Sequence, residues 1–203
     1  MQETAMFKKI GALTGKDESC SFRVWAPFAE KVQLWLESPV KKKINMNREE
    51  YGYWHVHLDD CRPGTRYLIQ VDDNTPLPDP ASVSQPEGVH DPSGVKDLSN
   101  YPWTDKSWQN IPLEDMIFYE LHTGTFSGTG NFRGIEQKLD YLTDLGINTI
   151  ELMPVGQFPG KRNWGYDGVY PFAVQNSYGG PEALMRLVNS CHEKGLAVVL
   201  DVI

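Results

Sequence analysis

The sequence predicts a chain of two parts, an antiparallel β-sandwich over residues 1–88 and the first βα units of a larger sheet over residues 113–203. Two observations lead to this prediction. Apolar and polar residues alternate over residues 20–71, which is typical of half-buried strands. In the second part, apolar strands alternate with segments of helical spacing. Residues 89–112 join the two parts as a proline-rich connector.

Four segments of the first part have a period of two. Pro27 separates the first two segments, and Pro63-Gly64 provides the turn between the last two. Short strands at such intervals favour a sandwich of antiparallel sheets. The predicted strands are Ser21–Trp25, Lys31–Leu36, Tyr53–Leu58 and Thr65–Val71.

Prolines recur between residues 72 and 112 and exclude a long helix or a central strand there. A freely flexible linker would favour Gly and Ser. The segment Pro78–His90 is therefore predicted to be an ordered strap that crosses the domain boundary.

The second part alternates strands with helices. Leu139, Leu142 and Leu145 lie at helical spacing, and Gly146 suits the end of their helix. The last strand is apolar throughout, which predicts burial on both faces. The predicted elements are strands Met116–His122, Ile147–Met153 and Leu196–Val202, with helices Phe132–Leu145 and Pro181–Lys194.

Successive βα units predict parallel strands, either in an open doubly wound sheet or in a barrel. An open sheet that binds nucleotides should have a glycine-rich phosphate turn after its first strand. Gly124, Gly128 and Gly130 follow that strand, but their spacing matches neither the dinucleotide fingerprint nor a P-loop. Acidic residues at strand ends, followed by long loops, favour the carboxyl face of a (β/α)₈ barrel.

The charge and composition exclude several classes of partner. The 203 residues carry a net charge of −8 with both signs mixed along the chain, whereas nucleic-acid binding needs a basic stripe. The short basic run Lys41–Lys43 is interpreted as a solvated loop. No apolar run approaches the ~18 residues of a membrane span. We therefore expect neither a nucleic-acid partner nor a membrane partner.

Cysteine and histidine spacing gives no sign of a metal or a disulfide framework. Cys20, Cys61 and Cys191 lack a C-x-x-C spacing, which predicts reduced thiols and a cytoplasmic protein. His55 and His57 share one strand face and could hold a metal, but no third ligand follows, so solvent-facing side chains are the preferred interpretation. We expect no metal and no cofactor.

The run Asn163–Tyr170 contains three aromatic rings, two glycines and a carboxylate. Flat rings beside polar groups suit a sugar, because its C–H faces stack on aromatic side chains while its hydroxyls need hydrogen-bond partners. The alternative is an ordinary turn with packed aromatic rings.

Three segments of the second part resemble the start of the catalytic barrel in the α-amylase clan of glycoside hydrolases and transferases: Tyr119–Phe126, Gly146–Pro154 and Leu200–Val202. The first part is similar to the immunoglobulin-like module that precedes the barrel in glycogen branching enzymes. The resemblance thus implies an immunoglobulin-like β-sandwich, a carbohydrate-binding-like module, followed by a (β/α)₈ TIM barrel that stops after its third strand.

Two stretches, Pro78–Ser82 with Gln85–His90 and Pro154–Val169, are similar to the maltooligosyltrehalose trehalohydrolases of this clan. Branching enzymes tend to carry a glutamine at the position of Asp167, and they lack the turn Phe158–Gly160. The resemblance implies an enzyme of carbohydrate metabolism that hydrolyses the α-1,4 bond next to the trehalose unit of maltooligosyltrehalose and releases trehalose.

The resemblance also implies roles for single residues. Tyr166 matches the clan tyrosine that stacks on the glucose to be cleaved, with Asn163, Trp164 and Asp167 around it as substrate-binding residues. A core tyrosine is the alternative. Asp201 matches the aspartate that opens the third-strand motif, and we expect it to support the site.

A retaining glycosidase needs two carboxyl groups about 5 Å apart, one on either side of the scissile bond. In this clan these two carboxyl groups and a third carboxylate come from the fourth, fifth and seventh barrel strands. Residues 1–203 contain only the first three strands, so no catalytic residue is assigned here. We expect residues 1–203 to be the N-terminal part of a longer enzyme and to be inactive alone.

Two other functions remain open at this stage. A branching transferase has the same order of modules. A non-catalytic α-glucan-binding module is made plausible by its tryptophans, because exposed indoles bind sugars whereas buried ones fill cores. These tryptophans are Trp35, Trp54, Trp103 and Trp108. The sequence leaves the oligomeric state open.

Overall fold

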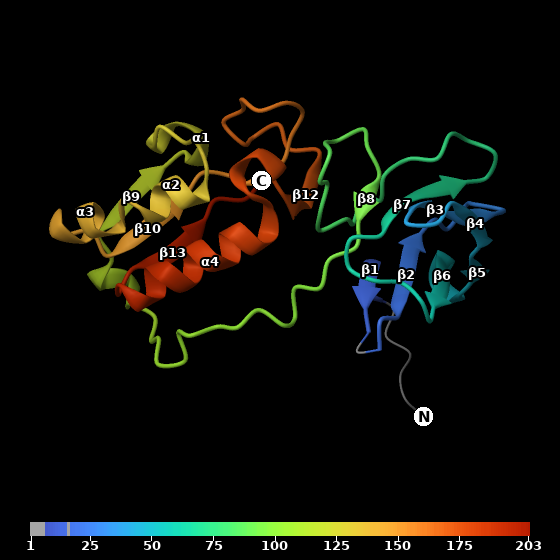
Figure 1. Ribbon diagram of the computed structural model, residues 1–203, viewed down its shortest axis with the longest axis horizontal. Coiled ribbons are helices and arrows are strands. Elements are labelled where there is room, and N and C mark those ends of the chain that lie inside the picture. Colours follow the sequence, from blue (N-terminus) through green and yellow to red (C-terminus); the bar gives the residue numbers. More distant parts are fainter. Residues whose placement is uncertain (1–6, 16) are drawn as a thin grey trace. The chain divides into compact units, whose positions relative to one another are not determined.

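The computed structural model describes residues 7–15 and 17–203 (Figure 1). The chain divides into two compact units, Met1–Asp97 and Leu98–Ile203. The predicted connector 89–112 is therefore shared between the units, and the other predicted domain limits remain predictions. Within the described part of the chain, no helix is long and apolar enough to cross a membrane.

The described residues of the first unit form a sandwich of two four-stranded antiparallel sheets around one core. One sheet has the order β1-β2-β6-β5, with β1 (Gly11–Thr14), β2 (Cys20–Trp25), β6 (Tyr53–Leu58) and β5 (Asn47–Arg48). The other has the order β4-β3-β7-β8, with β4 (Lys42–Asn45), β3 (Val32–Ser38), β7 (Arg66–Val71) and β8 (Ser93–Gly94). The 3₁₀ helix η1 (Glu50–Gly52) precedes β6.

Alternation along the strands puts one face of each sheet into a shared core. Phe22 of β2 meets Tyr67 of β7 edge-on, with ring centroids 4.8 Å apart. Cys20 and Cys61 are free and buried, and the Cys20 thiol donates to the Cys61 carbonyl across 2.9 Å. Edge-on aromatic contact adds to the stability that burial alone gives the core.

The interpretation of the basic run as a loop was wrong for two of its lysines. Lys42 and Lys43 open β4, which pairs with β3. The Lys43 ammonium lies 3.5 Å from the centroid of the Trp35 ring on the neighbouring strand, a cation–π contact. Lysines on a short edge strand also protect it from pairing with other chains.

The strap after β7 is ordered around a buried carboxyl group. Asp79 is 2% exposed, and its two oxygens accept from the Tyr67 hydroxyl at 2.8 Å and from the Ala81 amide at 2.9 Å. Its own amide donates to the Ser93 hydroxyl, which lies on β8. Burial raises the pKa of Asp79 above 3.8, while the two hydrogen bonds oppose this shift. Asp79 therefore joins the strap to two neighbouring strands of one sheet, to β7 through its carboxyl group and to β8 through its amide.

We predict that Asp79→Ala lowers the free energy of unfolding by about 3 kcal/mol, because it leaves the buried Tyr67 hydroxyl without a partner. Asp79→Asn keeps the shape and an acceptor, so it should cost less. Since the folded pKa is raised, the carboxyl group stabilises the fold most below its ordinary pKa, and that contribution declines as pH rises through the raised value. Urea midpoints from about pH 4 upward should show this decline in the parent and not in Asp79→Asn. Parallel curves would contradict it.

The second unit contains a parallel three-stranded sheet in the order β13-β10-β9. Its strands are β9 (Phe118–Leu121), β10 (Thr149–Leu152) and β13 (Ala197–Leu200). The helices are α1 (Thr123–Phe126), α2 (Phe132–Glu136), α3 (Leu139–Asp144) and α4 (Gly180–Glu193), with 3₁₀ helices η2 (Leu113–Asp115) and η3 (Asn176–Tyr178). A hairpin of β11 (Gly156–Gln157) and β12 (Tyr170–Val174) leaves the sheet after β10.

Helices cover one face of this sheet, with α4 running alongside β13 (Figure 1). Leu121 and Leu152 on that face are buried with Ile135, Leu142 and Leu187 from the helices. On the opposite face, Glu120 and Glu151 lie directly beside each other in register. Because the three strands are parallel, their carboxyl ends lie together at one edge of the sheet.

Two predictions for this unit were wrong in part. The single helix expected over Phe132–Leu145 is divided into α2 and α3, because Lys138 leaves the helical conformation and its amide bonds to Ile135, three residues back. The strand expected to be buried on both faces, β13, lies at a sheet edge, and Leu200 is 41% exposed. Composition predicted the strand but not its position in the sheet.

Candidate functional site

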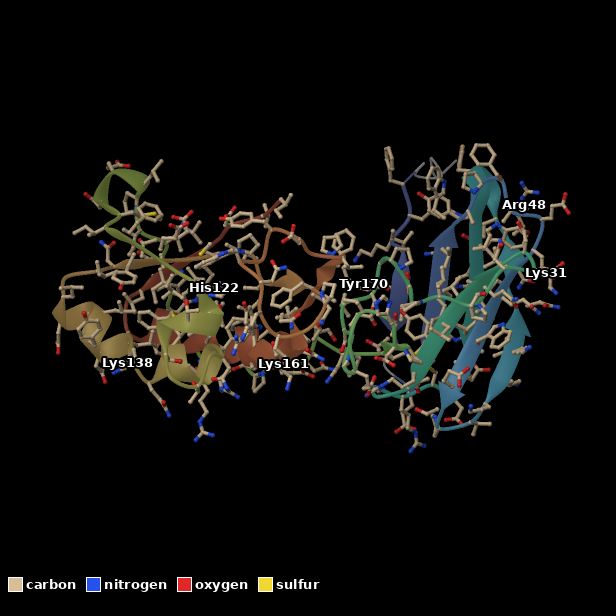
Figure 2. The ribbon with its side chains drawn as sticks, turned by 90° about the horizontal axis from the view of Figure 1, so that it is seen from above. Lys31, Arg48, His122, Lys138, Lys161 and Tyr170 are labelled. Atoms are coloured by element: carbon tan, nitrogen blue, oxygen red, sulfur yellow. The ribbon has the colours of Figure 1, made fainter. Side chains whose placement is uncertain are left out.

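The candidate site lies where the three parallel strands end. His122 follows β9, Pro154 follows β10 after one residue, and Asp201 follows β13. The segment 158–169, between β11 and β12, carries residues 163–169 of the aromatic run to the same edge, and Tyr170 opens β12. Figure 2 marks His122, Lys161 and Tyr170 in this unit.

Asn163 organises the backbone of the aromatic run. Its side-chain oxygen accepts from the Gly165 amide at 2.7 Å, and its side-chain nitrogen donates to the Asp167 carboxylate at 3.2 Å. An asparagine that bonds the backbone two residues later makes an Asx turn. Asn163 and Asp167, which were predicted to contact substrate, therefore bond to each other in this structure.

Gly165 lets the run pass close to the end of β10. Its φ is +100°, and a Cβ placed there would lie 2.1 Å from the Pro154 carbonyl oxygen. A side chain is excluded by both the backbone conformation and the contact. The turn therefore needs glycine at this position.

Tyr166 and Asp201 come together although they are far apart in the sequence. The tyrosine hydroxyl donates to the Asp201 carboxylate at 2.7 Å, and this hydrogen bond raises the pKa of Tyr166. The Asp201 amide in turn donates to the Leu152 carbonyl at 2.9 Å, which ties it to β10. The Tyr166 side chain remains 46% exposed, so its ring is held at the hydroxyl and open to solvent.

A pocket of about 210 Å³ lies beside this pair, lined by Tyr166, Asp201, Pro154, Leu200 and Pro171 among others. Trp164, 63% exposed, precedes Tyr166 by two residues in the run. The two exposed rings can stack on a pyranose ring, and the carboxylate can accept hydrogen bonds from its hydroxyl groups. The pocket beside them leaves room for the sugar.

His122 was not singled out by the sequence. Its Nε2 lies 2.7 Å from the Asn163 carbonyl oxygen and 3.0 Å from the Tyr178 hydroxyl, and its Nδ1 lies 3.0 Å from the Thr125 hydroxyl. The ring centroids of His122 and Trp164 are 5.1 Å apart. Its place as the last residue of a predicted strand, on the side that carries the long loops, was the available signal.

In the part of the chain that the structure describes, no group of three or more His, Cys, Asp or Glu side chains could hold a metal ion. His57 bonds to the Ser21 hydroxyl at 2.9 Å and lies 3.3 Å from the Asp59 carboxylate. Burial is the largest cause of a lowered pKa of His55.

The four tryptophans of the binding-module hypothesis differ in their surroundings. Trp54 is 6% exposed and donates to the Ala26 carbonyl, so it is a core residue. Trp108 is stacked on His192, with ring centroids 4.3 Å apart. Trp103 is 37% exposed. Trp35 is half-buried and faces Lys43.

Comparison with known proteins agrees with this division of the chain. Residues 116–203 match the model of the alpha-amylase catalytic domain, and residues 9–92 match that of carbohydrate-binding module 48, the isoamylase N-terminal domain. The two matches fall on the unit with the parallel sheet and on the sandwich, respectively.

Curated relatives of this chain include malto-oligosyltrehalose trehalohydrolases and a branching enzyme. Malto-oligosyltrehalose trehalohydrolase from Saccharolobus solfataricus is 47% identical over 92% of this chain and 33% of its own length. The enzyme of that name from Arthrobacter ramosus is 41% identical over 90% of this chain and 32% of its own. The branching enzyme GlgB of Vibrio parahaemolyticus is less similar, at 33% identity over 89% of this chain and 26% of its own. The chain thus spans about a third of the length of the trehalohydrolases it matches.

Solved structures show the same fold. A Salmonella typhimurium protein classed as an alpha amylase has a TM-score of 0.90 and 39% identity, covering 97% of this chain and 33% of its own. A pullulanase from Anoxybacillus, solved with maltotetraose, has a TM-score of 0.80 and 27% identity, covering 95% of this chain and 34% of its own.

Proposed function

We propose that this chain, which joins a carbohydrate-binding module 48 to the start of an α-amylase catalytic domain, is the N-terminal part of a maltooligosyltrehalose trehalohydrolase. Such an enzyme hydrolyses the α-1,4 bond between the trehalose unit and the rest of maltooligosyltrehalose and releases trehalose. The names of the curated relatives from Saccharolobus solfataricus and Arthrobacter ramosus support this activity. The pullulanase solved with maltotetraose supports a substrate of the maltooligosaccharide class.

The exposed ring of Tyr166, held at its hydroxyl by Asp201, is the observation that carries the proposal. A ring fixed at one end and open on its face can stack on the sugar without first losing conformational freedom. Asp201 acts in this proposal as the group that orients Tyr166. Trp164 extends the apolar surface, while Asn163 and Asp167 keep the run in shape and contact the sugar at its rim.

The catalytic carboxyl groups lie outside residues 1–203 in this proposal. Glu120 and Glu151 are neighbours on a single sheet face, whereas a retaining glycosidase needs carboxyl groups on opposite sides of the bond. We further propose that the sheet continues as a (β/α)₈ barrel, that the sandwich is immunoglobulin-like and that the protein is cytoplasmic. Both sheets of the sandwich are antiparallel, and its two cysteines are free.

A product assay on the complete enzyme tests the activity. Incubated with maltooligosyltrehalose, the enzyme should release trehalose, and incubated with a linear α-1,4 glucan, it should form no α-1,6 branches. A polypeptide limited to residues 1–203 is the control and should release none. Branch formation without trehalose release would instead show a branching transferase.

A second candidate function is α-glucan binding by the sandwich. The face around Trp35 favours it, because Gln70 accepts from the indole N–H at 3.0 Å and Gln33 and Asn45 form a further amide pair beside it. Amides around an indole suit sugar hydroxyls, although Lys43 must leave the ring first. Titration of the sandwich with maltooligosaccharides, compared with its Trp35→Ala variant, decides between binding and a purely structural role.

A further inference from the structure

We propose that His122 is a positioning residue of the substrate site: its imidazole holds the carbonyl group of Asn163 and thereby fixes the exposed rings of Trp164 and Tyr166. The expected effect of His122 on catalysis rests on the proposed function. Its role in fixing the aromatic run can be tested without that function.

The hydrogen-bond partners of His122 define its tautomer. A backbone carbonyl can only accept, so the Nε2 atom 2.7 Å from the Asn163 oxygen carries a proton. In the neutral ring, Nδ1 then accepts from the Thr125 hydroxyl at 3.0 Å. Both ring nitrogens are therefore engaged, and His122 links the end of β9, helix α1 and the aromatic run.

The surroundings of His122 are rigid on the side away from the run. The Tyr178 hydroxyl, 3.0 Å from Nε2, belongs to a side chain that is 2% exposed and packs edge-on against the Phe132 and Phe158 rings. Burial raises the pKa of Tyr178 to about 12, so its hydroxyl stays neutral. A Cβ on Gly124 would lie 2.9 Å from the His122 ring, so glycine leaves the space that the ring occupies. The imidazole is thus fixed by the core.

The Asn163 carbonyl that His122 binds lies at the first residue of the aromatic run, so its position sets where the run begins. From Asn163 onward, the backbone is fixed by the Asx turn to Gly165 and by the contact of Gly165 with Pro154. Tyr166 is then attached at its far end to Asp201. Without the bond to His122, the run would lose its first anchor while keeping the last one.

Three substitutions separate a positioning role from simple packing. In His122→Gln, an amide nitrogen can take the place of Nε2 and donate to the Asn163 carbonyl. His122→Asn places its amide near Nδ1, too far back to reach that carbonyl, and His122→Leu fills space without any donor. We expect His122→Leu and His122→Asn to lower kcat/KM by about tenfold, which is less than the ~10²-fold that a full ångström of misplacement costs. We expect His122→Gln to keep most of the parent activity.

A second readout does not need activity. Complete enzyme labelled with 5-fluorotryptophan gives a ¹⁹F resonance for Trp164, assigned through Trp164→Phe. All three variants lack the imidazole ring, so differences among them report the hydrogen bond. We expect one narrow Trp164 resonance in the parent and in His122→Gln, which keeps the donor to the Asn163 carbonyl. We expect a broadened resonance or several resonances in His122→Asn and His122→Leu, which lose it.

The inference is overturned if the Trp164 resonance is equally narrow in all variants, or if Gln loses as much activity as Leu. Should Leu fail to fold, the comparison of Asn with Gln carries the test. If the parent enzyme releases no trehalose, the proposed function fails, and the ¹⁹F spectra alone then judge the role of His122.

Discussion

Tyr166→Ala is expected to lower kcat/KM of the complete enzyme for maltooligosyltrehalose by ~10²-fold or more, a loss of about 2.7 kcal/mol in transition-state stabilisation. The ring excludes water and orients the pyranose for distortion toward an oxocarbenium-like transition state. The contact should therefore matter more in the transition state than in the ground state. Because the side chain is 46% exposed, Tm should change little. Steady-state kinetics and a thermal melt measure the two effects.

Tyr166→Phe is the matched control. It keeps the ring and loses only the bond to Asp201, so its activity should lie between those of the parent and the alanine variant. A core tyrosine would behave in the opposite way, because truncation to alanine would destabilise the fold by ~3–5 kcal/mol. An alanine variant that melts far below the parent but keeps its specific activity per folded molecule would show that Tyr166 is a packing residue.

Gly165→Ala is expected to cost about 10²-fold in kcat/KM. A Cβ at this position would lie 2.1 Å from the Pro154 carbonyl oxygen, so the run must shift by about an ångström, and a misplacement of that size has this cost. The shift would move Tyr166 away from Asp201. Kinetics with maltooligosyltrehalose measure the loss.

Gly160→Ala provides the control within the same loop. Gly160 also has a positive φ, of +75°, but a Cβ there would meet nothing within 4 Å. It therefore shares the backbone strain of Gly165→Ala without the collision. Equal losses of activity in the two variants would attribute the effect to strain and contradict the close approach to Pro154.

Much of the fold could be predicted from the sequence. Strand β6 has the bounds that its alternating residues indicate, because half-buried strands carry their period in the sequence. Pro181 predicted the first turn of α4, because its fixed φ and missing N–H suit that position. The break between α2 and α3 could not be predicted, because it comes from the conformation of Lys138 and not from a proline or glycine.

The candidate site was predicted in its residues more than in its contacts. The aromatic run and Asp201 were named from the sequence, and the structure brings Tyr166 and Asp201 together. The mutual bond of Asn163 and Asp167 depends on a local turn, and the position of His122 depends on two segments distant in sequence. Neither leaves a periodic pattern that sequence analysis could detect.

The most direct test of the central claim is a crystal structure of the complete enzyme, in a slowed variant, with maltooligosyltrehalose bound. The distance between the Tyr166 ring and the nearest pyranose carbon atoms is the decisive measurement. The proposed site predicts a pyranose face on that ring at about 4 Å, the range of apolar contact, with the Tyr166–Asp201 bond intact. A sugar bound elsewhere, with the Tyr166 ring covered by protein, would contradict the assignment of the aromatic run as the substrate surface.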